Sequence, residues 1–160
     1  MERDQPQSRA EWTAPQDGRL EIVIQAHPQA AATVTDSVSR LLEAQGWPEL
    51  RIAEVHLALQ EALANAIRHG CRSDPSQDVR CLVSCDERGD LTLVVRDPGD
   101  GFEAAVVADP LAPENVLKPG GRGVFLINHL MDTVDFRDGG REIVMRKRRH
   151  PSSAASPADS

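Results

Sequence analysis

Apolar positions recur along the chain with two periods, one typical of strands and one typical of helices. Partial alternation over residues 19–25 predicts a strand. Helical spacing then predicts one helix over residues 28–46 and a second over residues 48–69, which ends at Gly70, a natural C-terminal cap. The first part of the chain is therefore expected to form a strand followed by two helices.

The second part of the chain alternates between short apolar segments and turn residues. Its predicted elements are strands over residues 79–86, 90–96, 133–137 and 141–147 and a short helix over residues 124–131. Residues 97–120 contain four Pro and no sustained period, which is typical of a long functional loop. The order of elements predicts an α/β fold, an α+β two-layer sandwich in which a mixed sheet carries helices on one face.

Length and composition favour one domain. The chain has 160 residues and 40% of them are hydrophobic, enough for a substantial core. We place the domain at residues 19–148, between a flexible N-terminal arm over 1–18 and a disordered tail over 149–160. The sequence has no run of 18 apolar residues and no signal-peptide core near its N-terminus. We therefore expect a cytoplasmic protein that does not associate with membranes.

Charge and aromatic content argue against direct nucleic-acid binding. The chain carries 25 acidic and 18 basic residues, a net charge of −7, whereas non-specific nucleic-acid binding needs a basic surface. Aromatic residues make up only 3%, which disfavours a base-stacking surface. The basic run over residues 146–150 is most simply a solvated strand end. The three cysteines lack metal-ligand spacing and are expected to be reduced thiols.

Three polar residues on the second predicted helix give the strongest chemical signal. Glu61, Asn65 and His69 follow one another at intervals of four, so they line one stripe of the helix. A solvated helix face is the simpler interpretation and accommodates a Glu and a His well. Asn is a mediocre helix former in the middle of a helix, which favours a functional interpretation.

Two glycine-containing segments flank the long loop. Asp97 follows a predicted strand and precedes Gly99 and Gly101, which places a carboxylate beside a backbone that a ligand can approach closely. An ordinary Asp-Pro-Gly turn is the alternative. The Gly-Gly-Arg-Gly segment over 120–123 enters the short helix, where free N–H groups and the helix dipole favour an anion. Alone, this segment could equally be a flexible hinge, and neither segment matches a P-loop or a dinucleotide fingerprint.

The three motifs, in this order and at these distances, resemble the GHKL or Bergerat-type ATP-binding fold shared by gyrase, histidine kinases and MutL. The resemblance is closest to the anti-sigma-factor serine/threonine-protein kinases of bacterial partner-switching systems. The segment EALANAIRHG over 61–70 resembles their N box, DPGDGF over 97–102 their first glycine box, and GGRGVFLINHLMD over 120–132 their second. The resemblance covers about residues 20–148, nearly the whole predicted domain.

This resemblance implies a role for each matching residue. Glu61 is implied to be the general base that takes the proton from a serine hydroxyl, and Asn65 to hold Mg²⁺ through its side-chain carbonyl. Asp97 is implied to accept a hydrogen bond from the adenine amino group of ATP. The implied nucleotide-binding residues are Gly99 and Gly101 beside Asp97 and, around the triphosphate, Gly121, Arg122, Gly123 and Val124. His69 matches the family pattern without an assigned chemistry, and no residue of 103–119 is matched individually.

The resemblance implies an ATP-dependent protein kinase that also acts as an anti-sigma factor. Such a protein phosphorylates an anti-anti-sigma (STAS-type) partner, sequesters a sigma factor and forms a homodimer. The alternative is a non-catalytic ATP-binding module that binds partners without phosphorylating them. Glu61 favours catalysis but does not decide between the two.

Overall fold

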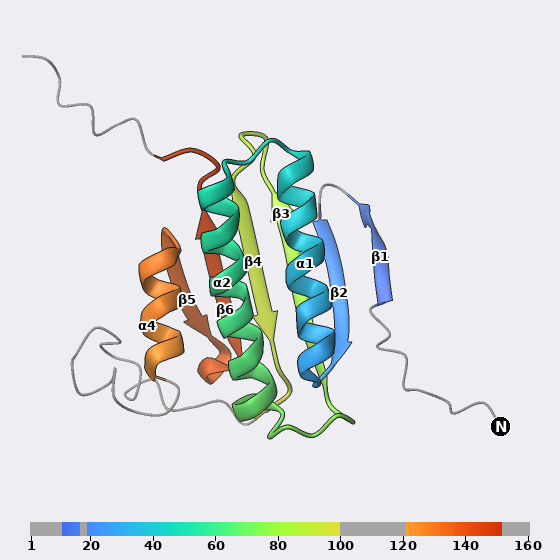
Figure 1. The fold of residues 1–160 in the computed structure, drawn as a ribbon. Helices are drawn as coiled ribbons and strands as arrows, with labels where there is room; N and C mark the ends of the chain where they lie inside the picture. The colour runs from blue at the N-terminus through green and yellow to red at the C-terminus, as the bar shows by residue number, and fades with distance from the viewer. Residues whose placement is uncertain (1–10, 17–18, 100–120, 152–160) are drawn as a thin grey trace, which may run out of the picture.

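The computed structural model describes residues 11–16, 19–99 and 121–151, which form a sheet covered on one face by helices (Figure 1). The six strands, in the order β1-β2-β3-β4-β6-β5, are β1 (Glu11–Gln16), β2 (Arg19–Gln25), β3 (Asp78–Cys85), β4 (Leu91–Arg96), β5 (Thr133–Arg137) and β6 (Glu142–Lys147). The helices α1 (Pro28–Ala44), α2 (Glu49–Asn65) and α4 (Gly121–Leu130) lie side by side, with α2 in the middle. The predicted two-layer α/β architecture is confirmed.

Strand direction corrects one part of that prediction, because every strand pairing among the described residues is antiparallel and the sheet is not mixed. Two antiparallel helices, α1 and α2, connect β2 to β3, so β3 returns against β2. The single helix α4 lies between β4 and β5, and these two strands do run in the same direction. However, β6 lies between them and pairs with both, so the two parallel strands are not neighbours.

The edge strand β1 corrects the prediction of a flexible arm over the whole of residues 1–18. Its backbone pairs with β2, with Glu11 opposite Val23 and Trp12 opposite Ile22. Residues 11–16 include Pro15 and several polar residues, so the alternation typical of a strand does not continue through the segment. Pro is nevertheless tolerated in a strand at the edge of a sheet. Residues 1–10 and 17–18 of the predicted arm, and residues 152–160 of the predicted tail, lie outside the described residues.

The hydrophobic core lies between the sheet and α2. Ile22, Cys81 and Leu93 face the helices from three neighbouring strands, and Leu59 and Leu63 face the sheet from α2; all five are fully buried. Burying a side chain of this size contributes about 1.5–3 kcal/mol. This packing fixes the rotation of α2, and thereby the direction of the polar residues on its other faces.

A buried ion pair fixes α4 against α2 and the sheet. Lys147 of β6 is only 3% exposed, and its ammonium donates to the carboxylate of Glu54 on α2. It also donates to the backbone carbonyl of Leu130, the last residue of α4. A cation at this position satisfies a free carbonyl and interacts favourably with the helix dipole. One side chain therefore joins three elements at the C-terminal end of α4.

Membrane-spanning helices, metal-binding clusters and disulfides are absent from the described residues. Within residues 11–16, 19–99 and 121–151, no helix is long and apolar enough to cross a membrane, and no group of three or more His, Cys, Asp or Glu could hold a metal ion. The three cysteines are free thiols, and burial raises the pKa of Cys81 to about 12.

Replacement of Lys147 by alanine is expected to lower the free energy of unfolding by about 3 kcal/mol, because Glu54 and the Leu130 carbonyl both lose a buried partner. Urea denaturation would measure this. Arg146→Ala is the matched control, since Arg146 is exposed on the same strand and its ion pair with Asp135 should contribute less than about 1 kcal/mol. Equal losses in the two variants would contradict the structural role of Lys147.

Candidate functional site

The three motifs identified in the sequence lie at one end of the molecule. The C-terminal end of α2, the N-terminus of α4 and the C-terminal end of β4 all reach this end (Figure 1). α1 and α2 run in opposite directions, which brings the C-terminal end of α2 to this edge, and β4 runs towards the same edge. The site can therefore be built from two clusters, one around Gly123 and one around Asp97.

The first cluster forms where α2 and α4 approach each other at Gly123. A Cβ atom built on this glycine would lie 3.1 Å from Glu61 Oε2 and 3.0 Å from Asn65 Nδ2. Ordinary carbon contacts are longer, so a side chain here would displace one or both polar groups. Glu61 and Asn65 are one helical turn apart, so they share one stripe of the helix as predicted, and both face the first turn of α4.

The side-chain carbonyl of Asn65 has no partner in this cluster. Its Oδ1 atom is buried and accepts no hydrogen bond from any residue that the structure describes. Leaving a buried acceptor unsatisfied costs roughly 1–3 kcal/mol, so such atoms in native proteins call for an explanation. A bound cation supplies one, because Mg²⁺ prefers oxygen ligands and takes only one or two of them from protein. The donor set at Asn65 therefore fits the implied Mg²⁺.

The second cluster holds Asp97 between two glycines. After Asn65 the helix widens into a π-helical turn (Ala66–Gly70), and this turn brings Gly70 against the Asp97 side chain. A Cβ built on Gly70 would overlap the carboxylate, and one built on Gly99 would overlap the Gly70 carbonyl. Gly99 donates its backbone N–H to Asp97 Oδ1 at 2.8 Å. Both glycines are thus required by close approach, and π-helical turns are frequent at functional sites.

Burial governs the ionisation of Asp97. Desolvation raises the pKa of this carboxyl above its ordinary value, while the Gly99 N–H and the nearby Arg141 charge oppose the rise. Cys71, which follows Gly70, is in the same environment, and burial raises the pKa of its thiol to about 11 with a further contribution from the Asp97 charge. Asp97 is therefore a carboxylate held at a cost in a partly desolvated position, which is suited to a specific hydrogen-bond donor.

The helix α4 begins inside the glycine segment, at Gly121, three residues before the predicted start at residue 124. The N–H groups of the first four residues, Gly121, Arg122, Gly123 and Val124, have no partner within the helix. These N–H groups and the helix dipole can bind an anion directly beside Glu61 and Asn65. Further along the helix, the Asn128 amide donates to the Val124 carbonyl at 3.0 Å.

The structure brings together most, but not all, of the residues that the sequence singled out. Glu61, Asn65 and Gly123 form one cluster, and Asp97 and Gly99 form the other. His69 lies in the π-helical turn and is exposed, so it leaves the stripe of the other two polar residues. Gly101 and residues 103–119 lie outside the described residues, as does the side chain of Arg122.

The contact of Gly70 with Asp97 is the feature of the candidate site that the sequence analysis missed. The position of Gly70 after a long helical pattern suggested only a C-terminal cap. Only the contact with Asp97 identifies Gly70 as part of the candidate site. The two residues lie in different sequence segments, and neither segment indicates this contact on its own. The π-helical turn that creates this pairing also continues the helical pattern without a break.

Comparison with known proteins places these observations in a family. The model of the histidine kinase-like ATPase domain matches residues 24–147 of the chain. The serine-protein kinase RsbW of Bacillus pumilus (strain SAFR-032) is 27% identical over 139 residues, which covers 80% of this chain and 84% of the relative. The RsbW proteins of Bacillus subtilis (strain 168) and Staphylococcus aureus (strain Newman) are 26% and 25% identical, each over 135 residues and 80% of this chain, covering 84% and 85% of the relatives.

Asp97→Asn is expected to leave the melting temperature at pH 7.5 unchanged or to raise it, because the amide keeps an acceptor for the Gly99 N–H and removes a buried charge. A carboxyl whose pKa is raised by folding binds its proton more tightly in the folded state. Lowering the pH into the range in which the folded-state carboxyl binds its proton should therefore stabilise the wild type relative to the variant and narrow any difference in melting temperature. Thermal unfolding without nucleotide would measure this, and a lower melting temperature for the variant at pH 7.5 would contradict it.

Proposed function

The chain belongs to the family of histidine kinase-like ATPase domains, and we propose that it is an ATP-dependent serine/threonine-protein kinase that acts as an anti-sigma factor. The observation that carries the proposal is the convergence of Glu61 and Asn65 on the first turn of α4. This convergence supports the proposal that a base, a metal ligand and an anion site share one small region. We assign the activity to residues 19–148.

The nucleotide would lie across both clusters. Asp97 would accept a hydrogen bond from the adenine amino group, with Gly99 and Gly101 leaving room for the ring. A guanine presents a carbonyl oxygen at this position, so two acceptors would face each other and ATP should be preferred over GTP. The triphosphate would be held by the backbone N–H groups of residues 121–124.

Asn65 would hold Mg²⁺ together with the phosphates. When bound, the ion would neutralise charge on the β- and γ-phosphates as the γ-phosphoryl group is transferred. The unpaired Asn65 Oδ1 supports this assignment. The position of Asn65 one helical turn after Glu61 lets the two side chains serve different parts of the same reaction.

Glu61 would act as the general base in phosphoryl transfer. Its carboxylate takes the proton of a Ser or Thr hydroxyl on the acceptor protein. The hydroxyl oxygen forms a bond to the γ-phosphorus, and the bond from that phosphorus to the β–γ bridging oxygen breaks, leaving ADP. Proton removal by a positioned carboxylate contributes about 10²–10⁴-fold to the rate of such a step.

The acceptor would be an anti-anti-sigma protein of the STAS type. Phosphorylation changes the charge of this partner by about −1.5 to −2. Because the kinase itself carries a net charge of −7, electrostatic repulsion would weaken their complex. The kinase is then free to hold a sigma factor in the cytoplasm, as a homodimer. The relatives described above, which are named serine-protein kinases, support the reaction class.

Glu61→Gln should keep nucleotide affinity while phosphate transfer to the anti-anti-sigma partner falls by about 100-fold or more, because the amide cannot take the proton. Asn65→Ala should instead lose Mg²⁺-dependent ATP binding. Radiolabelled phosphate transfer and calorimetric titration with ATP would measure the two effects separately.

Two outcomes would contradict the proposal. A wild-type transfer rate in Glu61→Gln would mean that Glu61 is not the base. A wild-type protein that binds ATP and a sigma factor but phosphorylates no candidate partner would instead be the non-catalytic module.

Gly70→Ala is expected to weaken ATP binding by about tenfold or more and to reduce the preference for ATP over GTP, because the added methyl group displaces Asp97 from the adenine pocket. Gly139→Asn is the matched control, since nothing lies within 4 Å of its position and Asn tolerates a positive φ. Calorimetric titration of both nucleotides would measure it. An unchanged ATP affinity in folded Gly70→Ala would remove Asp97 from the adenine site.

A further inference from the structure

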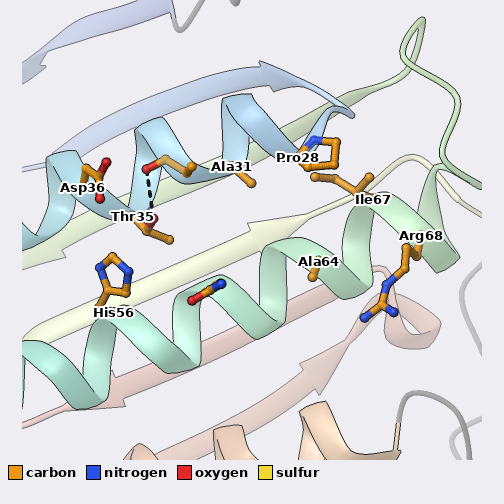
Figure 2. A pocket seen from close by; sticks show the side chains of 10 residues that line it. Pro28, Ala31, Thr35, Asp36, His56, Ala64, Ile67 and Arg68 are labelled. Carbon is orange, nitrogen blue, oxygen red and sulfur yellow. Dashed lines mark hydrogen bonds between the residues drawn. The ribbon is translucent and has the colours of Figure 1, made fainter.

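The outer surface of the helix layer contains a groove between α1 and α2 (Figure 2). Its volume is about 270 Å³, enough for one or two large apolar side chains. The groove exists because the residues that face each other across it are small. Ala31 and Ala32 line it from α1, Ala64 lines it from α2, and Ile67 lines it from the π-helical turn that follows. The floor of the groove is therefore apolar.

The walls of the groove are held in place by hydrogen bonds. The Ser39 hydroxyl donates to the Thr35 carbonyl at 2.9 Å, and it forms a second hydrogen bond with Nδ1 of His56 across the helix pair at 3.0 Å. A wall fixed in this way lowers the entropy lost when a partner binds.

Two opposite charges mark the ends of the groove. Asp36 lies at one end and Arg68 at the other (Figure 2). Neither forms an ion pair with another residue of the described part of the chain. A partner segment that fills the groove would therefore carry a basic group near Asp36 and an acidic group near Arg68. The apolar floor would favour a partner side chain of a certain size, and the two end charges would determine which way the partner segment runs along the groove.

The groove and Glu61 share the helix α2. Gln60, which lines the groove, directly precedes Glu61 on α2. Leu57, one helical turn before Glu61, is 39% exposed and is one of three large hydrophobic residues exposed in the described part of the chain. A protein that brings a hydroxyl to Glu61 must cover this part of α2. The same contact would bury Leu57 and reach the groove.

We propose that the α1–α2 groove and Leu57 form the docking surface for the protein that accepts phosphate at Glu61. An apolar side chain of the acceptor enters the groove, and oppositely charged groups of the acceptor pair with Asp36 and Arg68. This inference rests on the proposed kinase function, and it adds where the substrate protein binds. The groove then lies on the α1 side of α2, and the proposed nucleotide site lies on its α4 side.

The test uses the full chain, MgATP and the purified anti-anti-sigma protein of the same organism. Ala32→Phe fills the groove from an exposed position of α1, and Asp36→Lys reverses one of its end charges. Ala44→Phe and Glu43→Lys are matched controls on the same helix, exposed and outside the groove. Each groove variant should raise the apparent KM for the acceptor by about tenfold, with kcat and ATP affinity unchanged.

Direct binding of the acceptor in the presence of MgADP, measured by calorimetry, separates this inference from the kinase proposal. Loss of binding in the groove variants alone supports the docking surface even if no phosphate is transferred by the wild type. Wild-type KM and affinity in both groove variants would overturn the inference and leave the kinase proposal intact. Loss of sigma-factor binding with retained acceptor binding would also overturn it.

Discussion

The close approach of α2 to the first turn of α4 is the constraint on which the site depends. At Gly123 the two helices leave room for the carboxylate of Glu61 and the amide of Asn65, but not for a side chain. The opposite end of α4 is held by Lys147, which also contacts α2. The helix is thus fixed at both ends against the same neighbour, and small changes at either end alter the geometry at the other.

Two polar groups of the site remain imperfectly satisfied by the protein itself. Asn65 Oδ1 has no partner among the described residues, and Asp97 is a carboxylate whose pKa is raised by partial burial. Each group lowers the stability of the fold. A ligand that formed a hydrogen bond or a coordination bond with it would offset that loss. Polar groups of this kind are expected at functional sites, where residues that bind a ligand often reduce the stability of the protein without it.

Much of this arrangement could be predicted from the sequence, because its signals are local. The spacing of Glu61 and Asn65 placed both on one helix face, and alternation located β2, β3 and β4 closely. The relation between Gly70 and Asp97 could not be predicted, since a π-helical turn continues the same apolar pattern as an α-helix. The wholly antiparallel sheet could not be predicted either. It arises because β6 lies between β4 and β5, and the hydrophobic periodicity of each strand does not indicate which strands pair.

The central place of β6 in the sheet has a consequence for the biosynthesis of the protein. Lys147 joins Glu54 across 93 residues of sequence, and β5 pairs with no described strand except β6. A nascent chain that has emerged only as far as α4 therefore has the N box and both glycine segments but cannot anchor the C-terminal end of α4. Emergence of β6 from the ribosome is the step at which a nascent chain can first assemble the complete site.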